Sequence, residues 1–204
     1  MEHPLTAKIP RLVVLAAGQG TNLLALLQAI EQGRLHAQVV LVVSHRADAP
    51  ALDHAQLRGI QTAVRTLAEV KSAGQNRDDL DAWLAQTVLA AEPDLVLCLG
   101  WMLILGEKFL LPMQVPGLNL HPALPGQLPG KDAIAAAWQA FQQGQIHETG
   151  VMLHEVVAEL DAGKPIAWVR MPLLAGESLE ALRTRMREAE HALVVAGVKT
   201  RLMR

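Results

Sequence analysis

Two patterns of apolar and polar positions alternate along the chain. Short, largely unbroken apolar runs are typical of strands buried on both faces of a sheet, and apolar positions three or four residues apart are typical of helices packed against one. The predicted strands are Arg11–Ala17, Val39–Val43, Gln61–Thr66, Asp94–Leu99, Gly117–His121, Gly150–Val157 and Pro165–Pro172. The predicted helices are Leu23–Ile30, Asp48–Arg58, Asp78–Ala91, Lys131–Gln143 and Ser178–Leu202, with a short one at most over Phe109–Gln114.

The order of these elements predicts the fold class. Strands followed by helices form β-α-β units, so we expect an α/β protein with a doubly wound, mostly parallel sheet and helices on both faces. The segment Pro122–Gly130 contains three prolines and two glycines and is expected to be a loop. Ligands of such sheets bind at the carboxyl ends of the strands, where the candidate residues below are expected to lie.

Composition and charge narrow the functional classes. The chain has 204 residues, of which 51% are hydrophobic and 19% charged, and its formal net charge is −2. These values predict one globular domain over residues 1–204, without the positive field that would attract a nucleic acid. The longest strongly apolar stretch, Leu95–Leu105, is shorter than the roughly 20 residues of a membrane-spanning helix, so no membrane partner is expected.

The N-terminal sequence and the cysteine content indicate a cytoplasmic protein. The segment Met1–Arg11 lacks the basic start, apolar middle and small-residue cleavage site of a secretory signal. The single cysteine, Cys98, has no partner for an internal disulfide and lies in an apolar run, so it is predicted to be a core residue.

A glycine-rich turn separates the first predicted strand from the first predicted helix. Its sequence, GQGTN, contributes Gly18, Gly20, Thr21 and Asn22 at a helix N-terminus, where backbone N–H groups favour an anion such as a phosphate. Leu23 stands where the dinucleotide-binding fingerprint has its third glycine, and no lysine follows as in a Walker loop. We therefore expect a phosphate site, with a turn that binds nothing as the alternative.

A carboxamide and an imidazole end the fifth predicted strand. Asn119 and His121 are two positions apart, so both side chains project from the same face of the strand. Together they can stabilise an oxyanion, and the imidazole can also move a proton near neutral pH. Asp161, in the turn Glu159–Lys164, would favour the imidazolium if it approached His121. The alternatives are a polar pair that satisfies loop backbone and an aspartate that only organises its turn.

Other reactive groups are not expected to form sites. His154 lies in the middle of a predicted strand and is either a core residue or part of a site wall. No His, Cys or carboxylate pair has metal-ligand spacing, so no metal is expected. A buried Cys98 is a poor nucleophile, and a G-x-S-x-G elbow does not occur in the sequence.

Several segments together resemble the phosphoribosylglycinamide formyltransferase family. They are GQGTN, SHRADAPAL, LGWMLIL, NLHPALPG and GVMLHEVVAELDAGKPI, in the family's order. The resemblance extends from about Arg11 to Leu202. It implies a formyltransferase-type sheet with antiparallel last strands and a cytoplasmic enzyme of purine synthesis. The implied reaction transfers a formyl group from 10-formyltetrahydrofolate, the co-substrate, to the primary amine of glycinamide ribonucleotide, without a metal.

The resemblance also assigns roles to residues. It implies catalytic roles for Asn119, His121 and Asp161. The residues implied at the ribonucleotide are Gly18, Gly20, Thr21 and Asn22 at the phosphate and Glu190 at the ribose. The residues implied at the folate are Arg77, Leu103, Leu105 and His154, with Arg77 facing the glutamate tail.

The chain departs from the family pattern at four places. Ala16-Ala17 precedes the glycine turn instead of a small polar pair ending in glycine, and Leu103 stands where many members have arginine. The loop Pro122–Gly130 differs from the common Pro-Ser-Leu-Leu-Pro form, and Lys164 lengthens the aspartate turn. These departures leave the amine acceptor and the folate contacts open. The sequence does not distinguish a monomer from a homodimer.

Three rival functions remain at this stage. An enzyme of the same fold could formylate another amine or hydrolyse formyltetrahydrofolate, although the expected phosphate loop favours a phosphorylated substrate. A nucleotide-binding oxidoreductase would need the glycine that Leu23 replaces. A binding module without catalysis would have no use for Asn119, His121 and Asp161 together.

Overall fold

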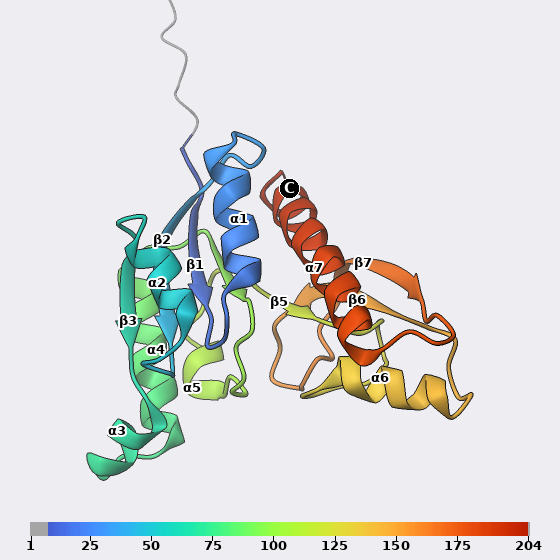
Figure 1. Ribbon diagram of the computed structural model, residues 1–204. Helices are drawn as coiled ribbons and strands as arrows, with labels where there is room; N and C mark the ends of the chain where they lie inside the picture. Colours follow the sequence, from blue (N-terminus) through green and yellow to red (C-terminus); the bar gives the residue numbers. More distant parts are fainter. Residues whose placement is uncertain (1–7, 204) are drawn as a thin grey trace, which may run out of the picture.

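The computed structural model describes residues 8–203 (Figure 1). Its strands are β1 (Arg11–Leu15), β2 (Gln38–Ser44), β3 (Gln61–Val64), β4 (Leu95–Cys98), β5 (Gly117–His121), β6 (Glu148–Glu155) and β7 (Pro165–Pro172). Its helices are α1 (Thr21–Glu31), α2 (Pro50–Gln56), α3 (Leu67–Ser72), α4 (Arg77–Ala90), α5 (Glu107–Leu110), α6 (Ala133–Gln142) and α7 (Leu179–Leu202).

The strands form one seven-stranded sheet in the order β3-β2-β1-β4-β5-β6-β7. Pairing is parallel from β3 to β5, whereas β6 pairs antiparallel with β5 and β7 antiparallel with β6. This topology confirms the predicted doubly wound α/β fold with antiparallel last strands. It brings the ends of β1, β2, β4 and β5 to one edge of the sheet.

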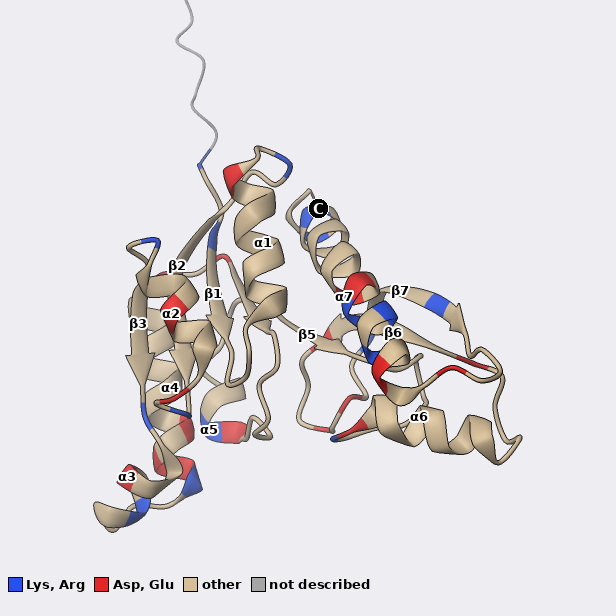
Figure 2. Cartoon of the chain, viewed as in Figure 1, with Lys and Arg blue, Asp and Glu red and all other residues tan. Residues whose placement is uncertain are grey.

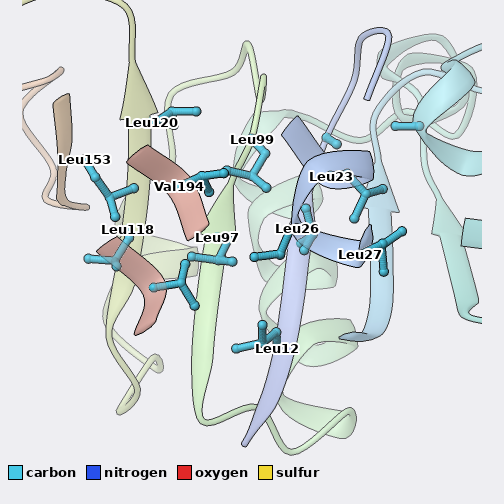
Figure 3. Close-up of a cluster of buried hydrophobic side chains, with 14 of the residues drawn as sticks. Leu12, Leu23, Leu26, Leu27, Leu97, Leu99, Leu118, Leu120, Leu153 and Val194 are labelled. Carbon is cyan, nitrogen blue, oxygen red and sulfur yellow. The ribbon is translucent and has the colours of Figure 1, made fainter. Parts of the chain in front are cut away.

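Helices cover both faces of the sheet. On one face, α1, α2, α6 and α7 bury a large cluster that includes Leu12, Leu23, Leu97, Leu118 and Leu153 (Figure 3). On the other face, α4 and α5 bury Val13, Val96, Leu84 and Phe109. Burying a side chain of this size contributes about 1.5–3 kcal/mol, so the two layers hold the strand ends in fixed positions. Both clusters rest on the same sheet, which supports our proposal of a single domain.

Most charged residues lie on the outside of these layers. Acidic and basic residues are intermixed over the helices and loops, and the central strands carry almost none (Figure 2). Cys98 is 3% exposed, as predicted for a core residue, and burial raises the pKa of its thiol to about 12. No helix within residues 8–203 is long and apolar enough to span a membrane. Most of the N-terminal segment assessed for a targeting signal lies outside the described residues.

Most predicted elements differ from the structure by one to three residues at their ends, and two differences and one unpredicted helix have local reasons. The third strand ends at Val64 rather than Thr66, because Thr66 caps α3 through a capping box with Glu69. Helix α3 was not predicted, although the T-x-x-E spacing of this box is a start signal. The short helix is Glu107–Leu110 instead of Phe109–Gln114, since Pro112 cannot continue a helix.

Candidate active site

Two neighbouring strands bring the polar side chains together. Asn119 and His121 occupy alternate positions at the end of β5, and antiparallel pairing sets His154 of β6 directly opposite Asn119. Residues directly opposite in a sheet share a face, so His154 joins the two side chains that the sequence places together. His121 and His154 are both buried.

The connection between β6 and β7 supplies a carboxylate. Asp161 adopts a left-handed backbone with φ 53°, which aspartate tolerates better than most residues. Two residues later the chain passes so close to β6 that a Cβ on Gly163 would lie 1.7 Å from the Glu155 carbonyl oxygen. Only glycine permits this approach, which turns Asp161 back over the sheet.

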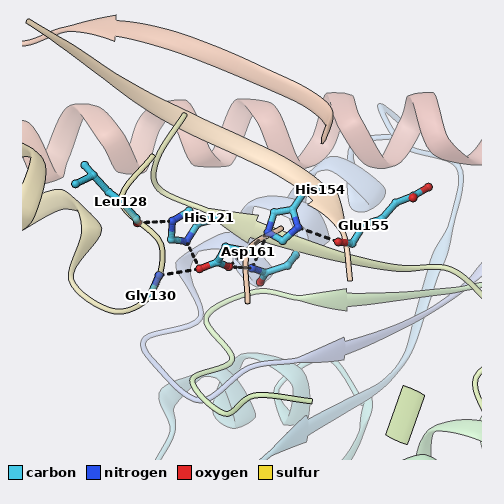
Figure 4. Close-up of polar contacts among 7 residues, drawn as sticks. His121, Leu128, Gly130, His154, Glu155 and Asp161 are labelled. Atoms are coloured by element: carbon cyan, nitrogen blue, oxygen red, sulfur yellow. Dashed lines mark hydrogen bonds and ion pairs between the residues drawn. The ribbon is translucent and has the colours of Figure 1, made fainter. Parts of the chain in front are cut away.

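Asp161 contacts all three side chains (Figure 4). Its Oδ1 accepts a hydrogen bond from Asn119 Nδ2 at 3.1 Å and lies 3.5 Å from His154 Nε2. Its Oδ2 lies 3.5 Å from His121 Nδ1 and accepts the Gly130 N–H at 2.8 Å. Asn119, His121 and Asp161 therefore meet, as the sequence analysis expected.

Both ring nitrogens of His121 face oxygen atoms. Its Nε2 lies 3.0 Å from the carbonyl oxygen of Leu128, which can only accept a hydrogen bond. Its Nδ1 faces Oδ2 of Asp161. Since both ring nitrogens face oxygen acceptors, only an imidazolium can donate to both.

His154 is held through both of its ring nitrogens. Its Nδ1 lies 2.8 Å from the Glu155 carbonyl oxygen, which can only accept a hydrogen bond. Its Nε2 lies 3.1 Å from Asn119 Nδ2 and 3.5 Å from Oδ1 of Asp161. The two N–H bonds of Asn119 are thus directed at His154 and Asp161, which leaves its amide oxygen facing away. This orientation differs from the expected one, in which Asn119 pointed an N–H group at an oxyanion.

The pKa of the Asp161 carboxyl is held below its usual value. Burial acts to raise it, but the contact with His154, the Gly130 N–H and the positive charge on His121 outweigh burial. Asp161 is therefore an anion at neutral pH and an effective partner for a charged imidazole.

The glycine turn precedes α1 at the same edge of the sheet. Gly20 has φ 71°, and a Cβ there would lie 2.6 Å from Cα of Ala51, so the turn packs directly against α2. No side chain in the described part of the chain caps α1, which leaves the N–H groups near Thr21 for another acceptor. Asn22 donates from Nδ2 to Oε2 of Glu190 on α7 at 3.0 Å.

Glu190 is held in an unfavourable environment for a carboxylate. Burial raises the pKa of its carboxyl above the usual value, and the Asn22 hydrogen bond and the charge of Arg187 offset only part of this effect. Of the phosphate-loop candidates Gly18, Gly20, Thr21 and Asn22, Asn22 thus contacts the ribose candidate Glu190.

The folate candidates lie around the segment that follows β4. Arg77 begins α4 and donates from Nη2 to Asp81 and to the Ile104 carbonyl. Leu103 is half-buried, whereas Leu105 is 6% exposed and packs into the core beneath α4 and α5. The side chain of Leu105 is therefore a core contact, and only its backbone remains for a ligand.

An aromatic contact joins the segment after β4 to His45, the residue that follows β2. The ring centroids of His45 and Trp101 are 4.6 Å apart and the rings are nearly perpendicular. Burial, followed by the charges of Arg77, Arg46 and Lys131, lowers the pKa of His45 to about 4. His45 is therefore neutral at pH 7 and acts as a packing residue against Trp101.

Comparison with known proteins identifies the family. The sequence profile of the formyl transferase family matches residues 10–198. Phosphoribosylglycinamide formyltransferase of Schizosaccharomyces pombe is 40% identical over an alignment of 198 positions that covers 93% of this chain and 96% of that protein. The chain belongs to the formyl transferase family.

Other members of the formyl transferase family agree in sequence and in structure. The Saccharomyces cerevisiae phosphoribosylglycinamide formyltransferase is 40% identical over an alignment of 200 positions that covers 91% of this chain and 94% of that protein. The crystal structure of glycinamide ribonucleotide transformylase 1 from Symbiobacterium toebii superposes with a TM-score of 0.87 at 32% identity. That superposition covers 98% of this chain and 90% of the other.

Sequence reasoning missed several residues in and around the candidate site. The Leu128 carbonyl and the Gly130 N–H contact His121 and Asp161, but backbone contacts from a loop leave no sequence signal. The buried Asp81 had a signal, because it lies four residues after Arg77 on one helix face. Within residues 8–203, no group of three or more His, Cys, Asp or Glu side chains could hold a metal ion.

Proposed function

We propose that this formyl transferase carries the formyl group of 10-formyltetrahydrofolate to the primary amine of glycinamide ribonucleotide. The observation that carries the proposal is the contact of Asp161 with both Asn119 and His121, in a chain 40% identical to a phosphoribosylglycinamide formyltransferase over nearly its full length. The uncapped start of α1, with Glu190 beside it, supports a phosphorylated ribose as part of the acceptor.

The proposed reaction is direct acyl transfer. The substrate amine attacks the formyl carbon and a tetrahedral oxyanion forms. When the intermediate collapses, the bond from carbon to N10 of the folate breaks and a proton passes from the amine to N10. Each step conserves atoms and charge without a covalent enzyme intermediate.

In this proposal, His121 stabilises the oxyanion. Its Nε2–H donates to the Leu128 carbonyl. When substrate binds, the formyl oxygen replaces this carbonyl as the acceptor. A positively charged donor in a buried site stabilises developing negative charge strongly, and losing one such donor costs about 2.7–4 kcal/mol of activation free energy. The loop Pro122–Gly130 must then shift at Leu128 when substrate binds.

Asp161 and Asn119 have supporting roles in the proposal. Asp161 keeps His121 charged and organises the water that relays the proton to N10. The amide oxygen of Asn119, turned away from Asp161 and His154, is suited to accept a hydrogen bond from the attacking amine. This role replaces the oxyanion contact expected from the sequence.

The decisive assay measures formyl transfer with matched acceptors. Purified protein and 10-formyltetrahydrofolate are incubated with glycinamide ribonucleotide, with glycinamide alone or with no amine, and formamide product and formate are quantified. We expect efficient transfer only to the ribonucleotide. Formate release independent of the amine, or equal transfer to glycinamide, would contradict the proposal.

A further inference from the structure

A buried carboxylate ties helix α4 to the segment Gly100–Gly106 that follows β4. Asp81 is 2% exposed, and its Oδ2 accepts the Gly106 N–H at 2.8 Å. Its Oδ1 accepts from Nη2 of Arg77 at 3.0 Å, and the same nitrogen donates to the Ile104 carbonyl. Both hydrogens of Arg77 Nη2 are thus used, one in the hydrogen bond to Asp81 and the other in the hydrogen bond to the Ile104 carbonyl of the segment.

The geometry at Gly106 makes this contact specific. A Cβ on Gly106 would lie 2.6 Å from Oδ2 of Asp81, so only glycine allows the backbone N–H to reach the carboxylate. A buried carboxylate needs such partners, because an unpaired one would be strongly unfavourable. Arg77 and Gly106, which are far apart in the sequence, are therefore joined through Asp81. We call these three residues the α4 clamp.

The segment that the α4 clamp holds presents an apolar surface. Trp101 and Leu105 pack inward against the cluster under α4 and α5, whereas Met102 and Ile104 are 53% and 61% exposed. The segment follows β4, whose last residue pairs with Asn119 of β5. Met102 and Ile104 therefore form an apolar wall at the same edge of the sheet as the candidate catalytic residues.

We propose that Asp81 and Arg77 are positioning residues for the folate co-substrate, through the α4 clamp and the wall formed by Met102 and Ile104. This inference rests on the proposed function. Flat aromatic rings such as those of 10-formyltetrahydrofolate are the chemical class that an exposed apolar wall fits. Arg77 acts by holding the Ile104 carbonyl, and the glutamate tail of the folate is not needed for its effect.

The test compares two folates in matched variants. Steady-state constants are measured for Asp81→Asn, Arg77→Gln, the double variant and the control Asp78→Asn, which changes an exposed carboxylate on the same helix. The formyl donors are 10-formyltetrahydrofolate and 10-formyltetrahydropteroate, which lacks the glutamate tail. The KM for glycinamide ribonucleotide is measured in parallel.

The clamp predicts a specific pattern. Asp81→Asn and Arg77→Gln each raise the KM of both donors by the same factor, about 10-fold to 100-fold, because a small displacement of the wall is sufficient. The KM for the ribonucleotide and kcat at saturation stay near those of the wild type, and the double variant is no worse than the worse single one. Asp78→Asn leaves all constants unchanged.

Two results would overturn the clamp. If Arg77→Gln affects only the donor with a glutamate tail, Arg77 binds that tail directly. If Asp81→Asn leaves both donor KM values unchanged, Asp81 has no positioning role. Should Asp81→Asn fail to fold, Arg77→Gln and Gly106→Ala carry the same comparison. A wild-type protein that transfers no formyl group would instead refute the proposed function, so the two failures are distinguishable.

Discussion

The Nδ1 atom of His121 lies 3.5 Å from Oδ2 of Asp161, and this contact joins the end of β5 to the connection between β6 and β7. The other ring nitrogen of His121 is held by the Leu128 carbonyl, and the other oxygen of Asp161 by Asn119. The pair is fixed from both sides, so a change in either residue alters the charge that the other one meets.

The stability contribution of Asp161 depends on pH with a defined sign. Its pKa is lower in the folded protein than the value of about 3.9 in an unfolded chain, so the unfolded state binds the proton first as the pH falls. The contribution is full above about pH 4 and is lost as the pH drops through the lowered pKa. Urea unfolding of wild type and Asp161→Asn between pH 7 and 3 measures it. If the free energy of unfolding of the wild type exceeded that of the variant by more at acid pH than at neutral pH, this prediction would be wrong.

We expect the ionised Glu190 carboxyl to lower the free energy of unfolding and, at the same time, to contribute to substrate binding. Because burial raises its pKa, the ionised carboxyl is penalised in the folded state at neutral pH. Glu190→Gln should therefore increase the free energy of unfolding at pH 7, and the gain should shrink as the pH falls toward the usual glutamate value of about 4.3. The same variant should raise the KM for glycinamide ribonucleotide.

A matched control for Glu190 lies on the same helix. Glu188 is exposed, so Glu188→Gln should change neither the stability nor the KM. Loss of stability in Glu190→Gln at pH 7, measured by chemical denaturation, would show that the ionised carboxylate is favourable and contradict the account.

The amide orientation of Asn119 predicts an unequal pair of variants. Asn119→Asp replaces the donor that faces Asp161 at 3.1 Å with a second carboxylate, whereas Asn119→Ala only removes the donor. Like charges at this distance repel, so Asn119→Asp should be the less stable variant at pH 7 and should recover toward acid pH, as one carboxyl takes a proton. Equal melting temperatures of the two variants at pH 7 would contradict an arrangement in which an N–H bond of Asn119 faces Asp161.

The tight turn at Gly163 predicts a large loss of stability from one methyl group. Gly163→Ala places its Cβ against the Glu155 carbonyl, and relieving that contact should cost about 3 kcal/mol or more and displace Asp161. Gly144 provides the control, because it has φ 70° with open space around it, so Gly144→Ala should cost only about 1–2 kcal/mol. Similar losses for both variants would exclude the close approach as the reason for glycine at 163.

The sequence was sufficient to predict the strands, their mostly parallel arrangement and the three central side chains. Apolar runs predicted every strand, and the i, i+2 spacing of Asn119 and His121 predicted their common face. The role of His154 depends on the antiparallel register that sets it opposite Asn119, and no local pattern encodes that register. The Leu128 contact depends on loop backbone, and the burial of Leu105 on packing against α5, so neither was predictable.

The central claim is that His121 and Asp161 act as one unit in formyl transfer. The most direct measurement is kcat/KM for glycinamide ribonucleotide in wild type, His121→Asn, Asp161→Asn and the double variant. We predict that each single change lowers kcat by about 10²–10⁴-fold with little change in KM, and that the double variant is no worse than the worse single one. Losses that multiply in the double variant, or a near-normal kcat for Asp161→Asn, would contradict the account.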